Sequence, residues 1–78
     1  MQVDIISPDK EIFSGEATFV GVPGVDGSMG ILNNHAPLIT TLRTGEVKVK
    51  DSKGNEECFE VKGGVLEVMD NKVIILAE

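Results

Sequence analysis

The sequence has few aromatic residues and no excess of positive charge. Its 78 residues include three phenylalanines, no tryptophan and no tyrosine, and the formal net charge is −6. A protein that binds nucleic acid needs a basic face for the phosphates, and single-strand binders add aromatic platforms for the bases. The same negative charge disfavours adsorption to anionic lipid. The composition therefore argues against nucleic acid and against direct lipid insertion.

Cysteine and histidine are nearly absent, with one of each at Cys58 and His35. A single cysteine excludes an intrachain disulfide, and a zinc-type site needs several Cys or His ligands. A catalytic nucleophile needs a base beside it, and no such pairing stands out in the chain. We therefore predict no metal, no nucleotide, no cofactor and no catalytic centre. Cys58 is interpreted as a core or surface thiol, and His35 as a structural or interface residue.

The chain also lacks long apolar runs and helical periodicity. No apolar stretch approaches the roughly 18 residues of a membrane-spanning helix, and no secretion signal is recognisable. No segment repeats its apolar residues with the period of a helix, about 3.6 residues. We expect no substantial helix, no membrane span and no export signal in this segment.

A period of two is present almost everywhere instead. Val47 and Val49 alternate with charged residues in 46–50, and residues 2–5 and 58–62 follow the same pattern. Such alternation is typical of half-buried strands. Eight or more short strands, at spacings of about 8–12 residues, favour a small all-β sandwich or barrel. A chain this short holds one domain.

Turn residues separate the expected strands. Gly45 and Gly54 are predicted to adopt positive φ, and Asp70-Asn71 is predicted to form a tight hairpin. Gly63-Gly64 interrupts a strand-like run, which indicates a bulge or a sharp bend.

Some expected strands are apolar on both faces. These are residues 17–22, 65–69 and 73–77. A small two-layer domain buries only one face of each sheet, so the extra apolar residues lie at a sandwich edge, under a loop or against another protein. Val20 and Val22 are among the residues expected to face outward toward a partner. From the residues alone, the chain is interpreted as a non-enzymatic, acidic module that binds another protein.

Glycine occurs at every third position from Gly21 to Gly30. A collagen repeat needs this register over a long span with abundant proline, and here it stops after ten residues. A phosphate-binding loop needs Lys-Ser/Thr and a helix after its last glycine, but Ile31 and Leu32 follow. We interpret residues 23–27 as a turn between two strands.

A lipoyl or biotinyl carrier domain is the alternative from another class. Such domains are small, all-β and often acidic, and they carry a lysine in a tight hairpin, where residues 68–73 offer Lys72. Carrier domains have two similar halves with this lysine near the middle. Lys72 lies six residues from the end of the sequence, which leaves only one return strand.

Several motifs in order resemble the N-terminal domain of the epsilon subunit of F-type ATP synthase, called delta in mitochondria. The similarity covers essentially all 78 residues. The matching segments are Ser7-Pro8, Phe13-Ser14-Gly15-Glu16, Val22-Pro23-Gly24, Gly30-Ile31, His35-Ala36-Pro37-Leu38, Gly63-Gly64-Val65-Leu66-Glu67-Val68 and Asn71-Lys72-Val73.

This resemblance implies a sandwich of two five-stranded sheets, about ten short strands, formed by residues 1–78 as a single domain. It implies a non-catalytic subunit of the rotor stalk that binds the gamma subunit and the membrane-embedded c-ring, coupling ion translocation to ATP synthesis or hydrolysis. It also implies a peripheral position on the cytoplasmic face of a bacterial membrane. The helical hairpin that follows the sandwich in most members is not expected here, because the sequence stops at Glu78.

The resemblance also assigns surfaces residue by residue. The loop facing the c-ring is expected at Asp26, Gly27, Ser28 and Met29. The gamma-facing surface is expected at Ser7, His35, Ala36, Pro37, Leu38 and Thr40, together with Val20 and Val22. Two departures stand out: Ser28 takes a position where members often have Glu, and Asn33-Asn34 replaces the usual Pro-Gly before the histidine.

Overall fold

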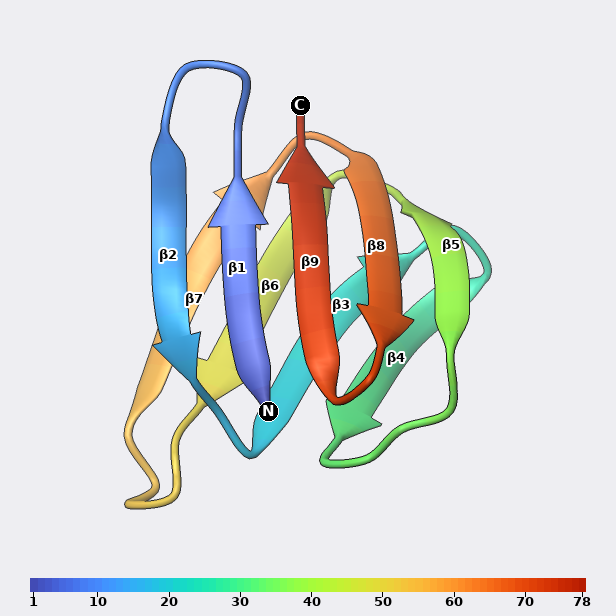
Figure 1. Cartoon of the computed structure of the whole chain (residues 1–78). Helices are drawn as coiled ribbons and strands as arrows, with labels where there is room; N and C mark the ends of the chain where they lie inside the picture. Colours follow the sequence, from blue (N-terminus) through green and yellow to red (C-terminus); the bar gives the residue numbers. More distant parts are fainter.

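The computed structural model describes all 78 residues, which form nine β-strands and no helix (Figure 1). No helix of the structure has the length and apolar character that a membrane crossing needs. The strands are β1 (Gln2–Ile6), β2 (Glu11–Glu16), β3 (Phe19–Gly24), β4 (Gly27–Leu32), β5 (Leu38–Leu42), β6 (Gly45–Lys50), β7 (Glu56–Val61), β8 (Gly64–Met69) and β9 (Lys72–Ala77).

The strands form one hydrogen-bonded sheet that folds back on itself into two layers (Figure 1). The order is β2-β1-β9-β8-β5-β3-β6-β7, and β4 pairs with β3 off this path. β5 and β3 share a single residue pair, Leu42 with Gly24, and the sheet turns the corner there. The predicted all-β sandwich is therefore confirmed, with five strands in the layer from β2 to β5 and four, not five, in the other.

The core lies between the two layers and is purely apolar. The alternation predicted for residues 2–5 and 46–50 is confirmed, because Val3, Ile5, Val47 and Val49 all point inward. No polar or charged residue is buried. The core consists of Met1, Val3, Ile5, Ala17, Val20, Val22, Ile31, Leu42, Val47, Val49, Val61, Leu66, Val68, Val73, Ile75 and Ala77.

Two of these core residues correct the sequence analysis. Val20 is fully buried and Val22 is 3% exposed, so neither faces outward and the assignment of both to a gamma-facing surface is wrong. The reason is the pairing of β3 with β4, which places Val20 opposite the buried Ile31. Phe19 and Gly21 are the residues of this strand that face outward.

The centre and the ends of the sheet are built differently. β1 and β9 run parallel in the middle of the five-stranded layer, from the pair Gln2–Lys72 to the pair Ile6–Leu76. β2 and β7 are the two ends of the strand order. They meet through side chains, because the rings of Phe13 and Phe59 lie 5.5 Å apart at 52°.

Most predicted turns are confirmed. Asp70 and Asn71 have φ of 51° and 58°, the values that a tight two-residue hairpin requires at both positions. Gly54 has a φ of 86° in its turn, and Gly63 and Gly64 have φ of 130° and 141° between β7 and β8. Gly45 was predicted wrongly, because its φ is not positive. It serves close packing instead, since a β-carbon there would lie 2.8 Å from Pro23 Cβ.

Candidate functional site

The β3–β4 hairpin presents the loop predicted to face the c-ring. Its turn is Val25-Asp26, flanked by the paired glycines Gly24 and Gly27, and Gly27 has a φ of 134°. Val25 N–H donates to Thr41 O at 3.1 Å, which ties the turn to the end of β5. Asp26 and Ser28 are exposed, whereas Gly27 and Met29 are half-buried. The turn is therefore held at its base and free at its tip.

Arg43 reinforces this anchoring from the other side. Its backbone N–H donates to Pro23 O at 2.8 Å, and its Nε donates to Gly24 O at 3.2 Å. Both acceptors precede the turn, so the hairpin leaves the sheet in a fixed direction. The positions of Asp26 and Ser28 follow from this anchoring.

The glycines within the hairpin make room for an aromatic ring. Gly21 and Gly30 form a cross-strand pair on the outer face of the four-stranded layer. A β-carbon on Gly30 would lie 2.8 Å from the Phe19 ring, and one on Gly21 would lie 3.2 Å from it. Lys50 Nζ lies 5.9 Å from the centre of the same ring. The ring and the glycines border an open hollow of about 540 Å³, whose lining also includes Ser28, Glu46 and Lys48.

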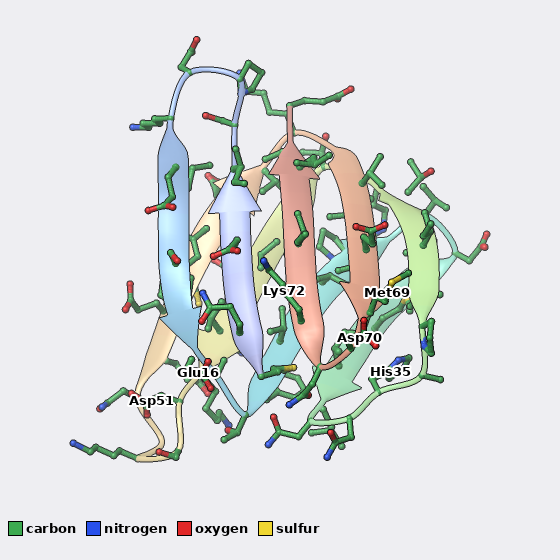
Figure 2. All side chains as sticks on the ribbon, in the orientation of Figure 1. Glu16, His35, Asp51, Met69, Asp70 and Lys72 are labelled. Atoms are coloured by element: carbon green, nitrogen blue, oxygen red, sulfur yellow. The ribbon has the colours of Figure 1, made fainter.

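The outer face of the five-stranded layer carries the largest group of exposed apolar side chains. Ile6, Leu76 and Val65 stand in one row across β1, β9 and β8, because Ile6 pairs with Leu76 and Leu76 pairs with Val65. Ile39 and Met69 complete the group, which we call the outer patch; Figure 2 labels Met69 on β8. Glu67 lies within this group, because it stands between Val65 and Met69 on β8 and pairs with Ile39. Their exposed fractions are 38% for Ile6, 52% for Leu76, 40% for Val65, 69% for Ile39 and 50% for Met69.

A polar cluster on β2, β1 and β9 borders the outer patch. Ser14 Oγ donates to Asp4 Oδ1 at 2.7 Å, Gln2 Nε2 donates to the same oxygen at 3.0 Å, and Lys72 Nζ lies 3.7 Å from Asp4 Oδ2. The hydrogen bond from Ser14, followed by that from Gln2 and the charge of Lys72, lowers the pKa of Asp4. Lys72 is thus the first residue of β9 and lies beside Asp4, while the tip of the hairpin is Asp70-Asn71. Figure 2 labels Lys72 and Asp70.

The residues predicted to face gamma lie in two places. Ser7 follows the end of β1, is half-buried, and its Oγ donates to Lys10 O at 3.1 Å. His35, Ala36 and Pro37 lie in the connection from β4 to β5, at the opposite end of the same layer, where Figure 2 labels His35. The outer patch lies between these two places.

Leu38 and Thr40, the other two predicted gamma-facing residues, lie on β5. Leu38 pairs with the buried Val68 and Thr40 pairs with the buried Leu66, so both side chains turn toward the inner face. Both are half-buried, and the exposed neighbour between them is Ile39. Sequence reasoning missed Ile39 as a surface residue, because it placed its neighbours Leu38 and Thr40 on the outward face and only the pairing with β8 shows that they turn inward.

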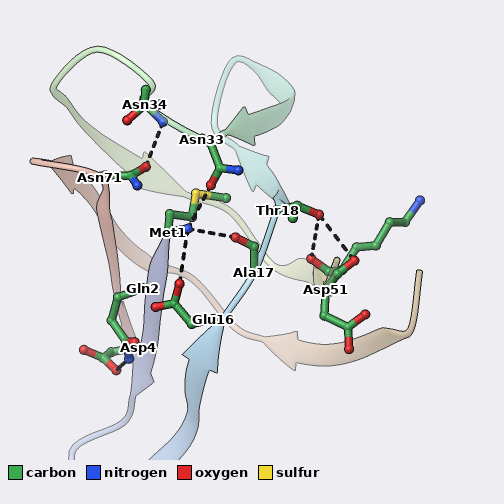
Figure 3. Close-up of polar contacts among 11 residues, drawn as sticks. Met1, Gln2, Asp4, Glu16, Ala17, Thr18, Asn33, Asn34, Asp51 and Asn71 are labelled. Carbon is green, nitrogen blue, oxygen red and sulfur yellow. Dashed lines mark hydrogen bonds and ion pairs between the residues drawn. The ribbon is translucent and has the colours of Figure 1, made fainter. Parts of the chain in front are cut away.

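The segment before His35 is fixed by polar contacts (Figure 3). The α-amino group of Met1 donates to Asn33 Oδ1 at 2.8 Å and to Ala17 O at 3.0 Å, and lies 3.7 Å from Glu16 Oε1. Asn34 N–H donates to Asn71 Oδ1 at 2.7 Å, and Asn34 has a φ of 62°. Asparagine tolerates this left-handed conformation better than most residues, so Asn34 can take the place of the family's usual glycine.

The potentially reactive side chains do not form a catalytic group. Cys58 is exposed on β7, and local desolvation together with the Glu46 carboxylate raises the pKa of its thiol, which disfavours the nucleophilic thiolate. His35 Nδ1 lies 2.7 Å from Ala36 O, the carbonyl of the next residue. No group of three or more His, Cys, Asp and Glu side chains could hold a metal ion.

Comparison with known proteins identifies what this arrangement is similar to. The family model of the ATP synthase delta/epsilon chain, β-sandwich domain, matches residues 1–78. A chain in the OSCP/F1/c-ring structure of the Euglena gracilis mitochondrial ATP synthase superposes with a TM-score of 0.89 at 23% identity, covering 96% of this chain and 48% of that one. A chain in the central stalk/c-ring structure of the Tetrahymena thermophila enzyme gives 0.82 at 23% identity, covering 99% and 62%. This sequence thus spans about half to three-fifths of those chains.

Proposed function

The chain belongs to the family of ATP synthase delta/epsilon chains, and from this premise we propose that it binds the gamma subunit and the c-ring as a non-catalytic part of the central stalk. In this role it transmits rotation between the c-ring and gamma, and so couples ion flow to ATP synthesis or hydrolysis. Its place is peripheral to the membrane complex, on the cytoplasmic face if the source is a bacterium.

The outer patch is the observation that supports gamma binding. Large apolar side chains that gather on one exposed face of a soluble protein mark candidate interaction sites. Five of the seven exposed large hydrophobic residues of this chain belong to the patch. Because the patch lies between Ser7 and the segment 35–37, it joins the two places predicted to face gamma into one surface.

The tip of the β3–β4 hairpin supports a separate contact with the c-ring. Asp26 and Ser28 are exposed there. The direction in which they point is fixed by the bond from Val25 N–H to Thr41 O and by the bond from Arg43 N–H to Pro23 O. A contact between Asp26 and a basic c-ring loop would lie at the rim of the interface. It would therefore contribute about 1 kcal/mol or less, and would serve orientation more than affinity.

Binding to purified gamma tests the proposal. The double variant Ile39→Glu/Val65→Glu puts two carboxylates in the outer patch, and we expect it to weaken gamma binding at least about tenfold through buried, unpaired charge. Val25→Glu is the matched control: Val25 is 50% exposed, against 40% for Val65, but lies at the hairpin tip. Isothermal titration calorimetry measures the affinity, and thermal unfolding shows that each variant is folded.

Two results would contradict the proposed function. The first is no complex between the wild-type chain and gamma at micromolar concentration. The second is a double variant that is folded and binds gamma as tightly as the wild type. Equal weakening by Val25→Glu would move the gamma contact from the sheet face to the hairpin tip.

A further inference from the structure

Three strands of this fold have one edge with no partner strand, and a fourth, β5, shares only the pair Leu42–Gly24 with β3. Of the three, one is unprotected. β2, β7 and β4 each pair with a neighbour on one side only. Natural proteins guard such edges with charged residues or proline, because an open edge can pair with another strand. β2 carries Glu11 and Glu16, and β7 carries three glutamates. β4, with the sequence GSMGIL, has no charged residue and no proline.

The backbone groups that β4 offers can be identified from its partner strand. Pro23 O accepts the Arg43 N–H on the β5 side, so the carbonyl of Pro23 points away from β4. Ser28 is the β4 partner of Pro23, and in an antiparallel ladder both members of such a pair turn their backbone groups outward. Gly30, two residues further, repeats this orientation. Ser28 and Gly30 are both exposed and therefore present free N–H and C=O groups.

The free edge has a defined length. At its far end, Leu32 O accepts the His35 N–H at 3.2 Å, so the chain itself closes the edge where the connection to β5 begins. At its near end lies the turn Val25-Asp26. The edge thus begins within the predicted c-ring loop, at Ser28, and ends at the predicted gamma-facing segment 35–37.

The sandwich is also incomplete on this side. β5 ends the five-stranded layer and β4 ends the four-stranded layer, and both lie on the same side in Figure 1. Met29 and Leu38 pack against the core from these two strands, yet both are only partly buried. Thr40, also turned inward, is half-buried beside them on β5. One further strand along β4 would make the two layers equal and would cover these side chains.

We propose that the free edge of β4 takes an extended segment of the gamma subunit as an added strand. This inference rests on the proposed function and adds a second mode of contact to the outer patch. The segment bonds to the backbone of Ser28 and Gly30, and carries an apolar side chain at every second position to cover Met29 and Leu38. Gamma is the expected occupant because the edge ends at the segment 35–37. A second copy is disfavoured by the net charge of −6 on each chain.

Amide hydrogen exchange by NMR, on the labelled chain with and without purified gamma, tests the inference. In the free chain the amides of Ser28 and Gly30 exchange rapidly, whereas those of Met29 and Ile31 bond to β3 and exchange slowly. In the complex we expect the amides of Ser28 and Gly30 to slow at least about tenfold, and that of Leu32 less because the chain itself closes the edge at Leu32.

The outcomes separate this inference from the proposed function. If gamma binds and the Ser28 and Gly30 amides still exchange rapidly, the added strand is wrong and the proposed function stands. If gamma does not bind, the proposed function fails and the added strand fails with it. If the chain alone protects both amides and sediments with twice its mass, the occupant is a second copy and the inference is overturned.

A proline pair gives an independent test. Ser28→Pro removes a free-edge N–H without touching the β3–β4 bonds, and proline is tolerated on edge strands at such positions. Cys58→Pro is the control. The Thr18 N–H donates to Lys50 O, so the backbone groups of Lys50, and of Lys48 two residues earlier, point toward β3. Cys58 is the β7 partner of Lys48, and its backbone groups therefore point to the free edge of β7. We expect Ser28→Pro to weaken gamma binding about tenfold and Cys58→Pro to leave it unchanged. Equal affinities for two folded variants would overturn the inference.

Discussion

At the scale of single residues, Gly64 and Gly54 differ although both have positive φ, 141° and 86°. A β-carbon on Gly64 would overlap the carbonyl oxygen of Leu76, which belongs to the backbone of β9 and cannot move aside. A β-carbon on Gly54 meets nothing within 4 Å. Packing, and not backbone angle alone, therefore distinguishes the two positions.

Alanine substitution at these two glycines tests this distinction. Gly54→Ala carries only the backbone strain, so we expect a loss of about 1 kcal/mol in the free energy of unfolding. Gly64→Ala adds a steric conflict between β8 and β9, so we expect a loss of more than about 3 kcal/mol in the free energy of unfolding, or failure to fold. Urea titration followed by circular dichroism measures both. Similar losses for the two variants would show that the β8–β9 contact is not tight.

Asp4 makes the stability of the fold depend on pH. Hydrogen bonds from Ser14 and Gln2 lower the pKa of Asp4 in the folded state. Its contribution to the free energy of unfolding is therefore fully present above the unfolded pKa of about 3.9, and it is lost as the pH falls through the folded pKa. We expect Asp4→Asn to lose about 1 kcal/mol at pH 7 and to differ little from the wild type near pH 2. Thermal unfolding at both pH values measures this, with the exposed Asp26→Asn as control. A constant difference across pH would show that Asp4 acts through packing.

At the scale of elements, the two ends of the strand order are joined without hydrogen bonds. Phe13 on β2 and Phe59 on β7 face each other across this seam, and both pack against the core. We expect each alanine variant to destabilise the domain, and a double-mutant cycle to give a coupling of about 1 kcal/mol. Denaturant unfolding of the four proteins measures it. Strict additivity would mean that the two edges are held by the core alone.

Strands and turns could be predicted from the sequence because they depend on local chemistry. The alternation in 46–50 fixed the inward positions Val47 and Val49, and Asp70-Asn71 fixed the last hairpin. The inward face of residues 17–22 was predicted wrongly because this segment is apolar on both faces. Nothing local shows that Val20 pairs with Ile31 on the inner face, while Phe19 covers two glycines on the outer face. The corner between β5 and β3 rests on one long-range pair, which no local pattern contains.

The candidate surfaces also differ in whether the sequence alone could predict them. The β3–β4 turn could be placed from its own glycines and proline, and Asp26 is exposed there as expected. The outer patch could not, because Ile6, Val65 and Leu76 come from three strands that only the sheet order brings into one row. Likewise, the free edge of β4 follows from the strand order alone.

At the scale of the whole molecule, the two proposed contact surfaces belong to one continuous sheet. The register places Leu76, Val65 and Thr41 in one row with Ile6, and Thr41 holds the base of the β3–β4 turn. The outer patch and the turn are therefore adjacent at one end of a single sheet. Because the core is close to fully buried and carries no polar group, a force on the turn is passed to the patch with little internal deformation.

The parallel pairing of β1 with β9 has a consequence for how the protein is made. These strands are 65 or more residues apart in sequence, from Ile6 to Lys72, yet they occupy the middle of their layer. During translation, at about 5–20 residues per second, β1 must wait several seconds for its neighbour. The nascent chain cannot complete this layer until β9 has left the ribosome. Such long-range pairing also raises the contact order, so we expect this layer to form slowly.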